Sequence, residues 1–176
     1  MTRLDDLFAD PWFPFTGDFA VKPLEPPVIP EPARSGETPN DCNGCKRQDS
    51  DFVWSNADWA LQADRDASFP GIVLLVTRGH YDSFADLPER LLAELGPMTA
   101  RVERAVLSMG DVARVHVLRW GDGSGHFHLW FMPRPLGAMQ LRGSMFPMWL
   151  DLLDPLSAAE QAPALQQIAA AMRAGD

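Results

Sequence analysis

Cysteine and histidine are scarce in this chain, whose 176 residues include two Cys and four His. Long apolar runs are also missing, and the run at residues 72–76 is far too short to cross a membrane. The first residues, MTRLDD, lack the basic and then apolar order of a secretory signal. These absences predict a soluble, cytoplasmic protein with no membrane partner.

Positive charge is in deficit as well. The chain has 15 Lys and Arg against 24 Asp and Glu, which gives a net charge of −9 and a pI of about 4.8. A nucleic acid polymer as partner is therefore not expected, since its phosphates need a basic surface. A small nucleotide stays compatible, because it needs only a local cluster of donors. With 176 residues, 46% of them hydrophobic, the chain is long and apolar enough to form one globular domain with a core.

Proline divides the chain into three parts. Residues 1–40 contain eight of the 16 prolines, a density that forbids regular helix and disfavours interior strands. We therefore expect a Pro-rich N-terminal arm over residues 1–40 and a domain core over residues 41–136. Residues 137–176 are expected to form a C-terminal tail whose helix packs on the domain. Trp12, Phe13 and Phe15 suggest that the start of the arm packs on the domain body or on a second subunit.

Regular hydrophobic patterns begin after residue 51. Period-two alternation and short apolar runs predict strands, and apolar residues at helical spacing predict helices. Gly96-Pro97 should kink or split the longer helical region, and Pro163 is a weak point of the second. The expected strands are 52–55, 58–63, 72–77, 114–120 and 126–132, and the expected helical regions are 84–109 and 156–173.

The strand GHFHLWFMPR, residues 125–134, carries the most informative pattern. Residues two apart share one face of a strand, so His126, His128 and Trp130 lie on the same side. They follow a Gly-rich turn, residues 121–125, that would join this strand to the preceding one as a hairpin. The two imidazoles favour a functional site over two satisfied core or surface histidines. The opposite face is wholly apolar and is expected in the core: Phe127, Leu129 and Phe131.

The two cysteines, Cys42 and Cys45, form one Cys-x-x-Cys motif. Such a motif can be half of a zinc site, a redox dithiol, or two free thiols. A redox dithiol usually opens a helix, whereas the Asn-Gly pair between these cysteines favours a knuckle-like turn. Structural zinc needs four ligands, so two more would have to come from the histidines. These are His80, His116, His126 and His128.

At these residues the chain resembles the histidine triad superfamily, whose signature is His-x-His-x-His, two apolar residues and Pro-Arg. Counted back from Pro133-Arg134, the triad positions are His126, His128 and Trp130. The segment PGIVLLVTRGH, residues 70–80, is similar to the buried strand of that family. The resemblance covers about residues 42–134. It implies an α+β fold with an antiparallel sheet, a long helical segment and a homodimer.

The resemblance also implies roles for individual residues. Some members, and the related galactose-1-phosphate uridylyltransferases, bind structural zinc at the positions of Cys42, Cys45, His80 and His126. The middle histidine, here His128, is the family's nucleophile, which attacks the α-phosphorus of a nucleotide and forms a nucleotidyl-histidine. Four further residues are expected to bind the substrate: Asp64 at the family's ribose position, Ser124 in the Gly-rich turn, Trp130 and Arg134.

Trp130 departs from the family pattern, which has His there, or Gln in the uridylyltransferases. An indole donates one hydrogen bond and cannot deliver a proton to a leaving group. We therefore expect nucleotidyl transfer or nucleoside phosphate hydrolysis through His128, on a nucleotide or nucleotide sugar. One alternative is a catalytically silent nucleotide-binding or interaction protein on the same zinc-stabilised fold. Another, outside this family, is a small zinc-stabilised binding domain.

Overall fold

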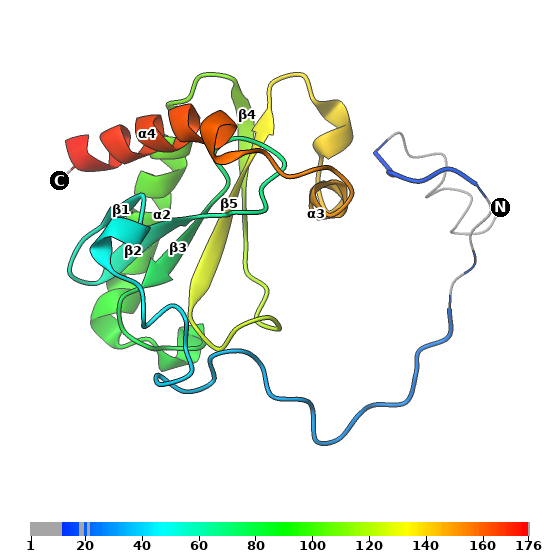
Figure 1. Cartoon of the computed structure of the whole chain (residues 1–176), viewed down its shortest axis with the longest axis horizontal. Helices are drawn as coiled ribbons and strands as arrows, with labels where there is room; N and C mark the ends of the chain where they lie inside the picture. The colour runs from blue at the N-terminus through cyan, green and yellow to red at the C-terminus, as the bar shows by residue number, and fades with distance from the viewer. Residues whose placement is uncertain (1–11, 18–19, 21, 176) are drawn as a thin grey trace.

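The computed structural model describes residues 12–17, 20 and 22–175. Within them, the chain folds around one antiparallel five-stranded sheet with the order β1-β2-β3-β5-β4 (Figure 1). The α+β fold class is confirmed. The strands are β1 (Trp54–Ser55), β2 (Trp59–Ala63), β3 (Val73–Thr77), β4 (Val112–Leu118) and β5 (His128–Pro135).

Two long helices cover one face of the sheet, and a short one lies at the other face. Helix α2 (Glu89–Leu107) and helix α4 (Ala158–Ala174) share the main core with the sheet. Helix α3 (Met145–Leu150) packs through Phe146 against Met132 on the opposite side. Single 3-10 turns complete the structure: η1 (Asp49–Asp51), η2 (Phe84–Asp86) and η3 (Met139–Leu141).

The alternation along β5 is confirmed. The apolar set Phe127, Leu129 and Phe131 is buried in the main core beneath α2 and α4. Trp130 and Met132 project from the other face and belong to the smaller cluster around α3. Because each strand residue alternates between the two faces, this core fixes the register that turns His128 and Trp130 away from it.

The hairpin of β4 and β5 is present, but its connection is longer than the expected turn. Strand β5 begins at His128, not at His126, and residues 119–127 form the loop. His126 leaves the strand because its ring turns inward, where it meets Cys42 and the carbonyl of Thr77. Trp120, expected at the end of β4, leaves that strand and packs edge to face on Trp130.

The longer helical region is one uninterrupted helix, so the expected split at Gly96-Pro97 is wrong. Pro97 and Ala93, whose carbonyl loses its partner, are both exposed, and water can satisfy that oxygen. The helix also begins later than expected. Ser83 and Asp86 close a separate 3-10 turn through reciprocal hydrogen bonds, and α2 starts after Pro88.

The Pro-rich arm has no regular helix or strand in its described part and runs along the outside of the domain (Figure 1). It contacts the body near both ends. Trp149 donates an indole hydrogen bond to the carbonyl of Trp12, whose ring also lies under the guanidinium of Arg142. At the other end, Ser35 forms an isolated bridge with Ser124 in the loop before β5.

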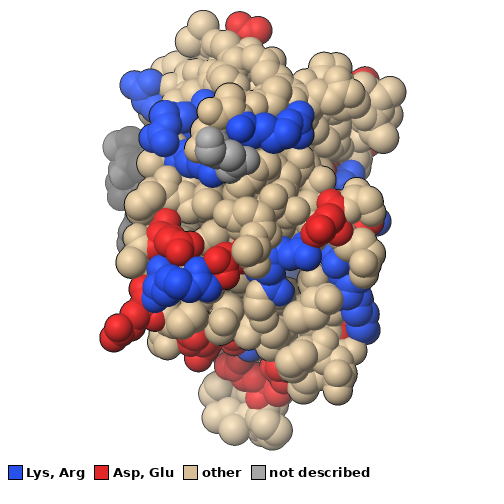
Figure 2. Space-filling view, turned by 90° about the vertical axis from the view of Figure 1, so that its left-hand side faces the viewer, with Lys and Arg blue, Asp and Glu red and all other residues tan. Residues whose placement is uncertain are grey.

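Acidic and basic side chains are mixed in the lower half of the face that Figure 2 displays, whereas several Lys and Arg side chains gather in its upper part. An ion pair joins Arg90 of α2 to Asp58, with 2.6 Å between Nη2 of the arginine and Oδ1 of the aspartate. No helix within the described ranges is long and apolar enough to span a membrane.

Candidate zinc and nucleotide site

Four side chains that are distant in sequence meet at one end of the sheet. The ligand atoms of Cys42, Cys45, His80 and His126 all lie within 4.8 Å of one another. They are the four residues expected from the family resemblance. The Cys-x-x-Cys segment forms turns, not the start of a helix, as a metal knuckle requires.

The distances fit a tetrahedral zinc ion. The Sγ of Cys42 lies 3.2 Å from Nδ1 of His126, and the Sγ of Cys45 lies 3.4 Å from Nδ1 of His80. Cys45 Sγ and His126 Nδ1 are 3.7 Å apart. Ligand atoms at ordinary Zn–S and Zn–N distances around a tetrahedral centre are separated by roughly 3.3–3.8 Å. Two thiols and two imidazoles are also the donor set that zinc prefers, so the cluster supports a structural zinc site.

His126 is oriented for ligation by a hydrogen bond on its far side. Its Nε2 lies 2.8 Å from the carbonyl oxygen of Thr77, so Nε2 carries the proton and Nδ1 keeps its lone pair for the metal. The ring is 5% exposed, and this burial lowers the pKa of His126. The neutral imidazole that a metal ligand needs is therefore favoured.

The Cys45 thiol shows why the cluster needs a cation. Burial is the main cause that raises the pKa of the Cys45 thiol to about 11, and the neighbouring Cys42 raises it further. A thiol with this pKa would stay protonated at neutral pH, and a bound metal ion is what favours its thiolate form.

The knuckle depends on a glycine. A Cβ added to Gly44 would lie 3.1 Å from both Cγ and Nδ1 of His126. A side chain at residue 44 would therefore press on the imidazole that faces the two thiols. The same knuckle also extends beyond the metal cluster, since Gly44 and its neighbour Asn43 line the pocket that contains His128.

His128 is held as a free nucleophile would be. Its Nδ1 lies 2.8 Å from the main-chain carbonyl oxygen of His126, so Nδ1 carries the proton and Nε2 has a free lone pair. The side chain is half-buried and lines a pocket of about 190 Å³ with His126 and Ser124. Arg47 is the one charged side chain that lines this pocket within the described residues.

The Gly-rich loop that carries Ser124 is fastened to the end of the arm. The amide of Gly125 donates to the carbonyl of Ser35 at 2.9 Å. Arg34 donates to both carboxylate oxygens of Asp82 and to the carbonyl of Gly121, at 2.6–3.1 Å. The guanidinium holds the pKa of Asp82 below its usual range, which keeps this ion pair formed at neutral pH.

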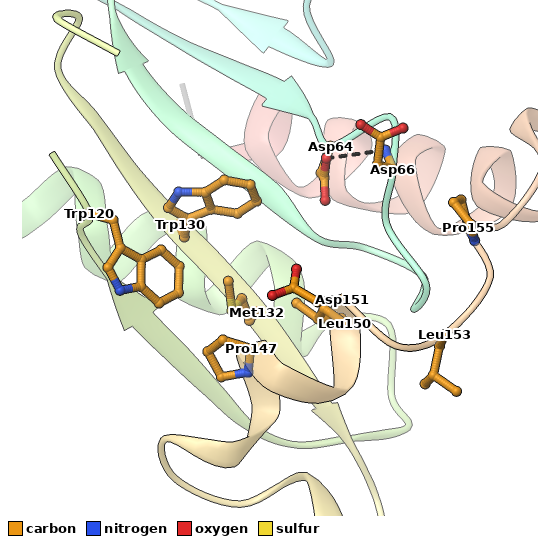
Figure 3. Close-up of a pocket in the computed structure, with 10 residues that line it drawn as sticks. All are labelled: Asp64, Asp66, Trp120, Trp130, Met132, Pro147, Leu150, Asp151, Leu153 and Pro155. Carbon is orange, nitrogen blue, oxygen red and sulfur yellow. Dashed lines mark hydrogen bonds between the residues drawn. The ribbon is translucent and has the colours of Figure 1, made fainter. Parts of the chain in front are cut away.

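A larger pocket of about 700 Å³ lies on the same sheet face, beyond Trp130 (Figure 3). The ring centroids of His128 and Trp130 are 6.5 Å apart, so the two pockets meet at adjacent side chains of β5. Asp64, the expected ribose ligand, lines this larger pocket, and burial raises its pKa. The structure thus brings Asp64 and Trp130 together, with His128 and Ser124 next to them.

Arg134 lies elsewhere. It is on the same face of β5 as His128, but six residues further along the strand, and it lines neither of these two pockets. Its guanidinium is buried and donates to the carbonyl of Ala138 at 3.3 Å. In this position the Arg134 guanidinium makes a structural contact and is not open to a substrate anion. His116 packs edge to face on Phe146 and is not part of the zinc-type cluster.

Several lining residues were not predicted from the sequence. Asn43, Arg47, Ser35 and Gln62 line the His128 pocket, and Asp66, Trp120 and residues of α3 line the larger one. The position of Arg47 two residues after the metal knuckle was a usable signal for a pocket cation. The contribution of α3 carried no motif, because it depends on how the tail folds back over the sheet.

An antiparallel sheet with this zinc-type cluster and a histidine at the start of strand β5 is the arrangement that the resemblance to the histidine triad superfamily implied. No family model and no curated protein matches the chain. Solved structures do match. A histidine triad protein from Marinobacter aquaeolei VT8 is 17% identical, with a TM-score of 0.59 over 73% of this chain and 94% of that one.

Two further structures share the fold. A zinc-bound histidine triad family protein from Mycobacterium smegmatis is 15% identical, with a TM-score of 0.51 over 71% of this chain and 87% of that one. A uridylyltransferase mutant is also 15% identical, with a TM-score of 0.53 over 77% of this chain and 48% of that one. The histidine triad fold predicted from the sequence is thereby confirmed.

Proposed function

We propose that this protein binds a nucleotide and transfers its nucleotidyl group through His128. The observation that supports this most strongly is the hydrogen bond from Nδ1 of His128 to the carbonyl of His126. It fixes the tautomer in which Nε2 can attack phosphorus, which is the arrangement an imidazole nucleophile needs. The structural neighbours include a histidine triad protein and a uridylyltransferase, and these names support a nucleotide as the class of substrate.

Donors beside His128 complement an α-phosphate. The guanidinium of Arg47 supplies positive charge, and the Ser124 hydroxyl and Asn43 amide supply neutral donors in the same pocket. Charge that develops on phosphate oxygens is stabilised best by donors that are already in place. In a chain with a net charge of −9, this local cation is what allows an anion to approach.

The reaction would take place in two steps. The Nε2 lone pair attacks the α-phosphorus, an N–P bond forms, and the P–O bond to the leaving group breaks. Water or the phosphate oxygen of an acceptor then attacks the same phosphorus, the N–P bond breaks, and the imidazole is restored; where water attacks, its proton passes to solvent. Throughout, the proton stays on Nδ1 and is donated to the carbonyl oxygen of His126. Zinc, when bound, would supply structure alone, by holding the Cys42–Cys45 knuckle against His80 and against His126, two residues before β5.

Trp130 limits the choice of leaving group. No acidic proton is available at the third triad position, so a group that departs as a stable anion, such as pyrophosphate, suits this site. The same observation supports a second candidate function, nucleotide binding without turnover. The two differ in whether an adduct forms on His128.

The test is to incubate the protein with labelled nucleoside triphosphates and nucleotide sugars, quench it, and map the label by peptide mass spectrometry. The proposal predicts an acid-labile adduct on the peptide that contains His128, absent in His128→Ala and retained in His116→Gln. Binding of nucleotides without any adduct would support the silent function. Neither binding nor adduct would refute both.

A further inference from the structure

The larger pocket differs from the His128 pocket in charge and in shape. Three carboxylates, those of Asp64, Asp66 and Asp151, line it together with apolar side chains from β5 and α3. No cation does so within the described residues. A phosphate would be repelled here, whereas the smaller pocket contains Arg47. The charge of the two pockets therefore sets the direction in which a nucleotide can lie.

Aromatic and apolar surfaces form the walls. Trp120 and Trp130 pack edge to face with ring centroids 6.1 Å apart, and Met132, Pro147 and Leu150 continue the lining. In Figure 3 the carboxylates of Asp64 and Asp151 point into the space between them, and both indoles lie to one side of it. A flat aromatic ring suits such walls, since nucleobases stack favourably on indole rings.

The polar groups that reach this space are hydrogen-bond acceptors. Among its lining side chains only the two indoles could donate, and Figure 3 shows their nitrogen atoms on the side away from Asp151. An ionised carboxylate accepts hydrogen bonds and donates none. A ring with exocyclic N–H groups can therefore satisfy these oxygens, whereas a ring with carbonyl oxygens in the same place faces like partial charge.

We infer that the larger pocket is a nucleobase site selective for bases with an exocyclic amino group, of the adenine or cytosine type. The inference rests on the proposed function, which places the α-phosphate at His128. It assigns the orientation of the whole nucleotide: phosphate toward Arg47, ribose at Asp64, and base between Trp130 and the carboxylate of Asp151.

The experiment measures tryptophan fluorescence during titration with nucleoside 5′-monophosphates in matched pairs. Adenosine and inosine monophosphates differ in the exocyclic amino or keto group and in the adjacent ring nitrogen, which carries a proton only in the keto base, and so do cytidine and uridine monophosphates. We expect the amino member of each pair to bind about tenfold more tightly, as one charge-assisted hydrogen bond implies. Asp151→Asn should abolish the difference, because an amide can also donate, and Asp154→Asn, an exposed acid outside the pocket, should preserve it.

Equal binding within each pair, or tighter binding of the keto member, would overturn the base selectivity. That result would leave the proposed transfer untouched as long as the His128 adduct still forms. Conversely, a preserved selectivity without any adduct would keep the base site and refute the transfer. His128→Ala should retain the amino preference, because His128 does not line the larger pocket.

Discussion

The ring nitrogen Nδ1 of His128 lies 2.8 Å from the main-chain carbonyl oxygen of His126, whose own ring faces two cysteine thiols. One residue therefore serves two sites: its side chain joins the zinc cluster, and its carbonyl orients the nucleophile. A disturbance of the metal cluster should reach His128 through this single residue. Substitutions in the zinc cluster and substitutions in the His128 pocket should therefore have separate effects on metal binding and on phosphorus chemistry.

Gly44→Ala tests the knuckle. The new methyl group would lie 3.1 Å from the imidazole of His126, a crowding that we expect to cost about 1–3 kcal/mol of folding free energy and to weaken zinc binding. Thermal unfolding in the presence and absence of a chelator measures both effects. Gly123→Ala is the matched control, because a Cβ there meets nothing within 4 Å and the residue has no positive φ, so the free energy of unfolding should change by less than about 0.5 kcal/mol. Equal effects of the two substitutions would refute the crowding argument.

Arg47→Gln tests the phosphate position. Loss of the pocket cation should weaken the binding of a nucleoside monophosphate by about tenfold and leave the binding of the free nucleoside unchanged. Isothermal titration of both ligands measures this difference. Lys46→Gln removes the same charge from an exposed neighbour outside the pocket and should have little effect. Equal losses in the two variants would mean that only the overall charge matters.

Trp130→His tests the third triad position. An imidazole there can protonate a leaving group, so hydrolysis of a nucleoside phosphoramidate should rise by about tenfold or more. Its rate should also depend on a group that titrates near pH 6.5, the ordinary pKa of histidine. Trp130→Phe keeps an aromatic wall without an acidic proton and should show no gain. If Trp130→Phe gained as much as Trp130→His, steric access and not proton transfer would explain the effect.

Much of the fold follows from local pattern. The alternation of Phe127, Leu129 and Phe131 with polar or aromatic neighbours predicts both faces of β5, and the structure confirms it. In the same way, the run of apolar residues in β3 predicts a buried strand, and the helical spacing of apolar residues in α2 predicts a helix. The residues alone left four histidines open as partners of the two cysteines, and the resemblance to the histidine triad superfamily implied the set Cys42, Cys45, His80 and His126, which the structure brings together.

What could not be predicted depends on contacts distant in sequence. His126 leaves the strand because its ring is turned toward Cys42 and Thr77, which no local pattern reveals. Pro97 remains inside a helix because it is exposed. The larger pocket closes only when α3 folds back over β5, so Asp151 carries no signal in the sequence.

Native mass spectrometry of freshly purified protein tests the central division of labour between His126 and His128. The account predicts one zinc ion per chain in the unmodified protein and in His128→Ala, and its loss in His126→Ala. The cluster distances and the separate hydrogen bond of His128 both require that result. A protein without zinc, or a His128→Ala variant that loses it while His126→Ala retains it, would contradict the account.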